Sequence, residues 1–139
     1  MNILITGTVM NADSNSTRVY KELVDICKEI SSNVSSPLDT IEFNGSDFER
    51  YKRAMELLRN THVLIAEMST ASTGQGMELQ EAVRLNIPII IIAKENSKIS
   101  GLIKGSGKVK SILKYNDIND IKDELIKQIK EENNERTNC

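Results

Sequence analysis

The chain has 139 residues, and its 18 Lys and Arg residues against 20 Asp and Glu residues give a net charge of -2. This length fits one domain with a sizeable core. The charge excludes the basic excess typical of proteins that bind nucleic-acid polymers or anionic membranes, so any phosphate that it binds is expected to belong to a small molecule. The longest apolar run, residues 87–93, is too short to span a bilayer, and no basic segment precedes an apolar one at the N-terminus. We therefore expect a soluble, cytoplasmic protein.

The cysteines and the single histidine argue against disulfide and zinc chemistry. Cys27 stands at helical spacing with Leu23 and Ile30, which predicts a buried thiol, and Cys139 ends a polar segment. His62 has no cluster of cysteines or histidines around it. The sequence therefore predicts neither a disulfide framework nor a metal site.

Short apolar runs alternate with longer amphipathic ones along the chain, which is typical of proteins built from βαβ units. The pattern predicts five strands, of which the second is the weakest: residues 3–5, 40–43, 62–66, 89–93 and 111–113. It also predicts four helices. The first is capped by Ser16 and the second by Ser46 or Asp47, and their core positions are Val19, Leu23, Ile26, Cys27 and Ile30 for the first and Phe48, Tyr51, Met55 and Leu58 for the second. The third covers about 75–86, and the fourth has the core positions Ile118, Ile121, Leu125 and Ile129.

Five parallel strands with crossover helices predict an α/β fold, a doubly wound flavodoxin-like sheet of order 2-1-3-4-5. We expect one domain over residues 1–130 and a polar, disordered tail over 131–139. Ligands of such sheets bind beyond the carboxyl ends of the strands, where the strand order reverses. Here that point lies between the first and third strands, whose following loops are residues 7–15 and 67–75.

The segment STASTGQGMELQEA, residues 69–82, joins a loop of small residues to a helix. Backbone amides at a helix N-terminus attract anions, so Ser72, Gly74 and Gly76 are expected around a phosphate. Glu78 falls in what the sequence suggests is the first turn, where the helix dipole would keep it ionised and suited to act as a nucleophile. The alternative is an ordinary loop followed by a favourably placed acid.

Glu67, at the end of the third strand, is a second carboxylate at the same edge. Pairs of carboxylates often carry out glycosyl transfer, although Glu67 fits a structural anchor equally well.

Two phosphate-binding motifs are excluded. Residues 6–11, TGTVMN, lack the G-x-G-x-x-G pattern of dinucleotide sites. Residues 101–108, GLIKGSGK, have one residue too many for a P-loop, and Val109 stands where Ser or Thr is required. We expect that segment to be a solvated loop near the rim of the site.

Residues 62–92 carry a specific combination of features. A strand ends in Ala66-Glu67, a loop with Ser72 follows, the pattern G-x-G-x-E-L covers residues 74–79, and Pro88 opens the next strand. This combination resembles the nucleoside 2-deoxyribosyltransferase-like superfamily, in particular the 2'-deoxynucleoside 5'-phosphate N-hydrolases. The resemblance extends more weakly to ITGT (5–8), VYKELV (19–24) and ISGLIKG (99–105).

The resemblance implies a five-stranded parallel sheet and a homodimer or higher homo-oligomer in which a neighbouring subunit completes each site. Glu78 would attack C1' of the sugar of a nucleotide or nucleoside, and water would release the product. Ser72 and the adjacent amides, with Ser100 from the same or the partner chain, would hold the 5'-phosphate. The sugar and base would lie along Gly7, Thr8, Val9 and Met10. No metal or organic cofactor is implied.

The chain departs from this family at two positions. The family's aspartate on the helix before the third strand is Ala54 by ungapped counting, and its arginine in the first loop is Met10. Loss of a proton-handling carboxylate commonly costs ~10² to 10⁴ in rate. Asp13, Asp47 or Glu67 are candidates to replace the aspartate.

Three hypotheses follow: an N-glycosidase or deoxyribosyltransferase-like enzyme, a module that binds a nucleotide without cleaving it, and a structural domain. The base, the sugar and the acceptor, water or another base, stay open.

Overall fold

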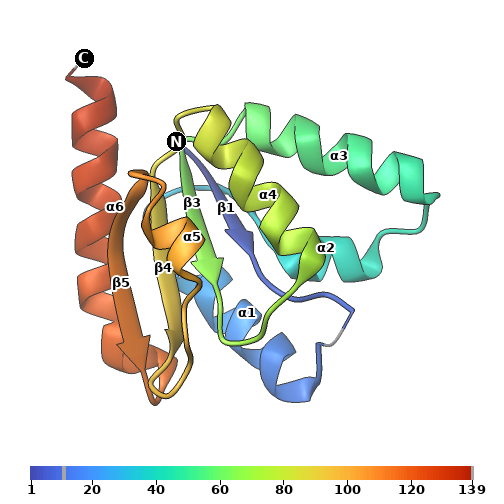
Figure 1. Ribbon diagram of the computed structural model, residues 1–139. Helices are drawn as coiled ribbons and strands as arrows, with labels where there is room; N and C mark the ends of the chain where they lie inside the picture. The colour runs from blue at the N-terminus through green and yellow to red at the C-terminus, as the bar shows by residue number, and fades with distance from the viewer. Residues whose placement is uncertain (11, 139) are drawn as a thin grey trace.

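The computed structural model describes residues 1–10 and 12–138, so the expectation for Cys139 lies outside the described residues. Its five parallel strands form one sheet in the order β2-β1-β3-β4-β5, which confirms the predicted doubly wound α/β fold (Figure 1). The strands are β1 (Asn2–Thr6), β2 (Asn33–Ser35), β3 (Val63–Glu67), β4 (Ile89–Lys94) and β5 (Val109–Tyr115). The order reverses between β1 and β3, whose registers pair Ile3 with Val63 and Thr6 with Ala66.

Helices cover both faces of the sheet (Figure 1). One face packs against α1 (Ser14–Lys28), a 3-10 turn (Ile118–Ile121) and α6 (Lys122–Thr137). The other face packs against α3 (Asp47–Arg59), α4 (Thr73–Arg84) and the short α5 (Gly101–Lys104). Helix α2 (Pro37–Glu42) connects β2 to the loop before α3.

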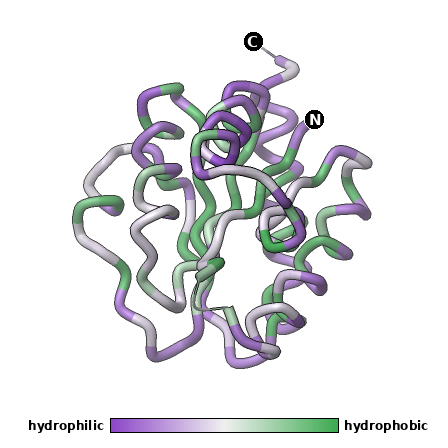
Figure 2. The backbone as a smooth tube through the Cα atoms, turned by 90° about the vertical axis from the view of Figure 1, so that its right-hand side faces the viewer, coloured by the Kyte–Doolittle hydropathy of each residue, from purple (hydrophilic) through white to green (hydrophobic). Residues whose placement is uncertain are grey.

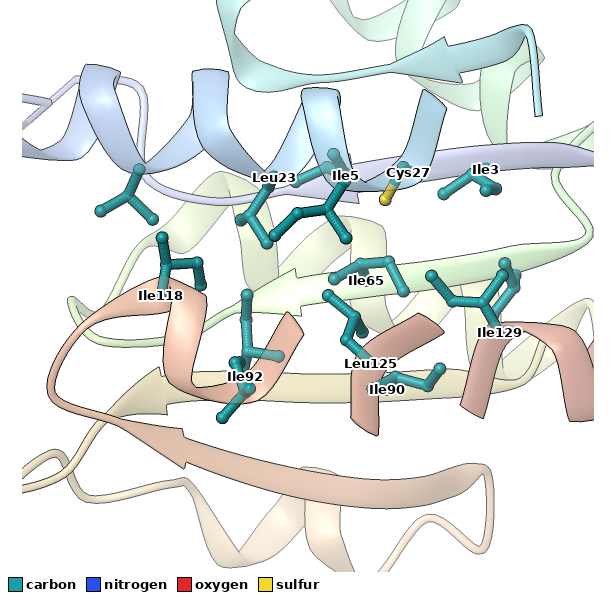
Figure 3. Packing of buried hydrophobic residues seen from close by; sticks show 14 of the residues in the cluster. Ile3, Ile5, Leu23, Cys27, Ile65, Ile90, Ile92, Ile118, Leu125 and Ile129 are labelled. Carbon is teal, nitrogen blue, oxygen red and sulfur yellow. The ribbon is translucent and has the colours of Figure 1, made fainter. Parts of the chain in front are cut away.

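Alternation along the strands divides the core in two. In β1, Ile3 and Ile5 point toward α1 and α6, whereas Leu4 points toward α3 and α4. Figure 3 shows the first cluster, in which Leu23 and Cys27 of α1 face the isoleucines of the strands. Cys27 is fully buried, as predicted, and burial raises the pKa of its thiol to about 12. In Figure 2 the hydrophobic colour is concentrated on the central strands, as expected for a sheet covered on both faces.

The predicted second strand was wrong. Residues 33–35 form β2 and pair with β1, while residues 40–42 belong to α2 and Phe43 is its C-cap. The reason is a helix start signal: Ser36 and Asp39 form a capping box, and Pro37 occupies the first helical position. That signal outweighs the apolar alternation of residues 41–43.

The helix caps and faces were predicted in part. Ser46 caps α3 as predicted, but α1 is capped by Asp13, whose side chain accepts from the Ser16 amide at 2.8 Å. On α3, Leu58 is fully buried whereas Phe48 is 72% and Tyr51 54% exposed, contrary to the prediction of one buried face. The first half of α3 lies beside α2, away from the strands, and so has no sheet to pack against (Figure 1).

The C-terminal segment also differs from expectation. Helix α6 continues to Thr137, through most of the tail expected to be disordered, and Glu132 is only 9% exposed. Within residues 1–10 and 12–138, no helix is long and apolar enough to cross a membrane.

Candidate active site

Two cavities lie on either side of the first turns of α4. The first, here called the Glu78 cavity, has a volume of about 200 Å³ and lies between the end of β1, α2, α3 and α4. Its polar and aromatic lining residues are Thr6, Ser36, Thr40, Phe43, Arg50, Tyr51, Arg53 and Glu78. The second, the Ser72 cavity, has a volume of about 480 Å³ and lies between α4 and the segment around α5.

Glu78 is the sixth residue of α4 and therefore lies in its second turn, because the helix begins at Thr73, earlier than expected. The stabilising effect of the helix dipole is confined to the first turn. Burial raises the pKa of the Glu78 carboxyl, and a hydrogen bond from the Thr6 hydroxyl to Oε1, at 3.0 Å, partly opposes that rise. The carboxyl group is thus partly desolvated and is held in place from the end of β1.

Helix α3 provides the opposite wall of the Glu78 cavity. Arg50, Arg53 and Ala54 line the cavity from one face of that helix, at spacings of three and one. Both guanidinium groups lie over the ring of Phe43, at 5.5 and 5.3 Å from its centroid. Among the lining residues Glu78 is the one carboxylate, so this wall is cationic and aromatic.

None of the acids considered as replacements for the family's aspartate lines this cavity. Asp13 caps α1, and its pKa is lowered by the bond to the Ser16 amide. Asp47 is exposed at the start of α3. Glu67 is only 6% exposed but belongs to a different group of residues.

Glu67 acts as an anchor for the strand ends. Its carboxylate accepts from the Ser69 amide at 2.7 Å, the Ser69 hydroxyl at 2.8 Å and the hydroxyl of Tyr115. The Ser69 oxygen also accepts from the amide of Lys94 at 2.8 Å. This network ties β3, β4 and β5 together, which matches the structural interpretation of Glu67.

The predicted phosphate-binding residues divide between the two cavities. Gly74 lines the Glu78 cavity, while Ser72, Gly76 and Ser100 line the Ser72 cavity. Ser72 is the N-cap of α4, its hydroxyl accepting from the Gln75 amide at 3.4 Å. Ser100 likewise caps α5 and accepts from the Leu102 amide at 3.3 Å. Within one chain the serines are therefore not beside Glu78, although both cavities meet the N-terminus of α4.

The first loop is divided in the same way. Gly7 and Val9 line the Glu78 cavity, whereas Thr8 lines a small cleft beside Glu67. Gly7 is required because a Cβ there would clash with the hydroxyl of Tyr20, which donates to the Thr8 carbonyl at 2.7 Å. Met10 is 97% exposed and lines neither cavity.

Five residues of the site were not predicted from the sequence: Thr6, Phe43, Arg50, Arg53 and Gln75. Gln75 is 2% exposed and donates to the carbonyls of Thr6 at 3.3 Å and Glu67 at 2.9 Å. The sequence does contain a signal for Gln75, an amide side chain between two glycines at the start of a helix. Such a side chain can donate hydrogen bonds to the carbonyls at the ends of nearby strands. The other four residues could not be assigned to the site without the position of α2. In the part of the chain that the structure describes, no group of three His, Cys, Asp or Glu side chains is arranged to hold a metal ion.

Known proteins provide independent information on this arrangement. Two archaeal relatives are each named "Putative 2'-deoxynucleoside 5'-phosphate N-hydrolase 1". The one from Methanosarcina barkeri is 30% identical over 93 residues, covering 63% of this chain and 58% of the relative. The one from Methanosarcina mazei is 30% identical over 90 residues, covering 63% of this chain and 56% of the relative. The chain thus matches less than two thirds of their length. No protein-family model matches it.

Two solved structures share the architecture. The CMP N-glycosidase BcmB of Clostridium botulinum has a TM-score of 0.68 at 15% identity, over 90% of this chain and 98% of that one. A 2-deoxyribosyltransferase from Bacillus psychrosaccharolyticus has a TM-score of 0.69 at 15% identity, over 88% and 90% of the two chains. The resemblance to the nucleoside 2-deoxyribosyltransferase-like superfamily is confirmed. At 15% identity the likeness to the solved structures concerns the fold.

Proposed function

We propose that the chain cleaves the N-glycosidic bond of a nucleoside or deoxynucleoside 5'-monophosphate, with Glu78 as the nucleophile. The observation that carries the proposal is the Glu78 carboxylate, partly desolvated and hydrogen-bonded by Thr6, in a cavity at the point where the strand order reverses. The names of the two archaeal relatives support the same chemistry.

The mechanism has two displacement steps. A Glu78 oxygen bonds to C1' of the sugar while the bond from C1' to the base nitrogen breaks, and the electron pair of that bond leaves with the base. Water then attacks C1' of the glycosyl-enzyme, frees the Glu78 carboxylate and gives up a proton that neutralises the departed base. Thr6 directs the carboxylate at C1' in both steps, since its hydroxyl holds one of the two oxygens.

The N-terminus of α4 is proposed to hold the 5'-phosphate. Ser72, Gly74 and Gly76 surround this end of the helix, where the helix dipole favours an anion. The Gly76 amide donates to the Ser72 carbonyl at 3.1 Å, so the amide of Gly74 rather than that of Gly76 is proposed to donate to the phosphate. Ser100 of the same chain borders the Ser72 cavity together with Ser72. Either this serine or, in the expected homodimer, Ser100 of the partner subunit is proposed to contribute to the phosphate site.

A binding module is the second candidate. The absence of any carboxylate besides Glu78 among the residues that line the cavity favours it, since no second carboxyl group there can donate a proton to the leaving base. Such a module would hold a nucleotide, or a signal derived from one, without cleaving it.

Chromatography of the free base after incubation with each nucleoside and deoxynucleoside 5'-monophosphate separates the two candidates. We expect base release by the wild type and a loss of ~10³-fold or more in Glu78→Gln, which keeps the shape but not the charge of the side chain. Glu81→Gln is the matched control, because Glu81 lies one turn along α4 and pairs with Arg84 at the surface. Nucleotide binding without base release from any substrate would establish the binding module instead.

A further inference from the structure

The wall of the Glu78 cavity opposite α4 contains an arginine whose donors are not used. Arg50 is held by the end of α2, donating to the carbonyls of Thr40 at 3.3 Å and Phe43 at 2.9 Å. Arg53 lies over the same Phe43 ring, at 5.3 Å, but makes no hydrogen bond or ion pair with residues 1–10 or 12–138. Its five N–H donors are thus available to a group inside the cavity.

The position of Arg53 relates it to the leaving base. It precedes Ala54, the position at which the resemblance implied an aspartate acting at the base, and both residues line the Glu78 cavity. Phe43 supports the flat face of the guanidinium group, which restricts the group's orientation and leaves its N–H edges free for in-plane contacts. Where the resemblance implied an aspartate that could exchange a proton, the cavity therefore has Arg53, a permanently charged hydrogen-bond donor of restricted orientation.

We propose that Arg53 selects nucleotides of 6-oxopurines and 4-oxopyrimidines over those of the corresponding 6-amino and 4-amino bases. This inference rests on the proposed glycosidase function and adds its leaving-group specificity. When the bond to C1' breaks, the electron pair remains on the base, and an oxo base delocalises that negative charge onto its exocyclic oxygen. Arg53 stabilises the departing anion by donating to this oxygen, and the anion takes its proton from water after it leaves.

An amino base fits this wall poorly. Arginine has donors and no acceptor, so an exocyclic amino group placed against Arg53 brings donor against donor. The oxygen and ring nitrogen of a 6-oxopurine instead match the arginine fork, the pairing by which arginine distinguishes guanine in DNA. With Glu78 as the one carboxylate among the lining residues, the cavity also offers no other charged acceptor for an amino group.

The test uses the full chain and two substrate pairs that differ in the exocyclic group, dIMP with dAMP and dUMP with dCMP. The kcat/KM for base release is measured for each, and the Kd of each is measured calorimetrically with Glu78→Gln, which binds without turnover. We expect the oxo member to be favoured about tenfold or more in the purine pair, as a good bidentate contact allows, and less strongly in the pyrimidine pair, in which O4 alone accepts. Arg53→Gln should reduce that ratio to about threefold or less, since it removes both charge and fork.

Two further variants control the result. Arg59→Gln removes an arginine on the same helix that does not line the cavity, and should keep the ratio of the wild type. Arg53→Lys keeps the positive charge but loses the paired donors of the guanidinium group, so it should give an oxo-to-amino ratio between those of the wild type and Arg53→Gln. This ratio can be measured even if Arg53→Gln folds poorly.

The outcomes separate this inference from the proposed function. Base release with no oxo preference, or with a preference that survives in Arg53→Gln, overturns the inference and leaves the glycosidase intact. An Arg53-dependent preference in Kd without any base release supports the inference for a binding module and refutes the glycosidase. If no base is released and no oxo nucleotide binds more tightly than its amino counterpart, both the inference and the glycosidase function are overturned.

Discussion

The two cavities beside α4 differ in what their walls can do. The Glu78 cavity combines a desolvated carboxylate with two arginines and two aromatic rings. The larger Ser72 cavity is lined by hydroxyls and aliphatic side chains, with Lys98 as its one charged residue. In the proposed function, the carboxylate that forms and breaks bonds is on one side of α4, whereas the serines proposed to hold the phosphate border the other. The start of α4 is common to both, so its placement determines whether the two sides can act on one ligand.

Gln75 fixes that placement, and its replacement should have the largest effect. Gln75→Leu leaves the buried carbonyls of Thr6 and Glu67 without their donor, and we expect a loss of about 2 to 3 kcal/mol in the free energy of unfolding. Urea denaturation measures it.

Gln80→Leu is the matched control for that change. Gln80 is exposed on the same helix and borders the Ser72 cavity, so its substitution should change stability by about 0.5 kcal/mol or less. Equal stabilities of the two variants would show that α4 is held by other contacts.

The second prediction tests whether the Ser72 side holds a phosphate. Ser72→Asp keeps an N-cap acceptor of comparable quality but adds a negative charge at the start of α4. We expect KM for a nucleoside monophosphate to rise about tenfold through repulsion, with a much smaller change for the unphosphorylated nucleoside. An equal rise for both substrates would exclude a phosphate there, and Ser72→Asn, a neutral cap, controls for loss of the hydroxyl.

The third prediction concerns the pH dependence of the Glu78 side. Thr6→Val removes the hydrogen bond that opposes the effect of burial, so the pKa of Glu78 should rise further. Because Glu78 attacks only when ionised, activity is lost as the pH falls through that pKa. The acidic limb of kcat/KM should therefore move to higher pH, and kcat should fall about tenfold with loss of positioning.

Thr6→Ser keeps the hydroxyl and should retain the profile of the wild type. Since arginine does not lose its proton in this range, no alkaline limb from Arg53 is expected in either protein. A bell-shaped profile would identify a proton donor at the leaving base, for which Tyr51 is the candidate among the residues lining the Glu78 cavity.

Four of the five strands, and the place of Glu78 near the start of α4, could be predicted because their signals are local. The apolar strands β3 and β4, the glycines around Gln75 and the proline before β4 each define a boundary by short-range chemistry. The strand order then followed from the general rules for crossover connections.

The cationic wall could not be predicted for a physical reason. Residues 41–43 alternate like a weak strand, whereas the capping box at Ser36 starts a helix that ends at Glu42 and leaves Phe43 as its C-cap, outside the sheet. Arg50 and Arg53 acquire their aromatic partner only because Phe43 ends α2, and the sequence pattern does not indicate that contact. The sequence also could not predict that Ser72 and Glu78 border different cavities, because this depends on which side of α4 each residue lies in three dimensions.

The smallest effect on the single chain is expected at the rim of the Ser72 cavity, where Leu102 is 89% exposed. Leu102→Gln should change the free energy of unfolding of the isolated chain by about 0.5 kcal/mol or less, since an exposed leucine has little apolar area to lose. If a second copy covers this rim, as the proposed dimer requires, the same substitution should lower the sedimenting mass at micromolar concentration. Phe48→Gln is the control, because Phe48 is 72% exposed on α3 and lines neither cavity. Dissociation by Phe48→Gln but not by Leu102→Gln would move the interface to α3 and leave the Ser72 cavity open to solvent.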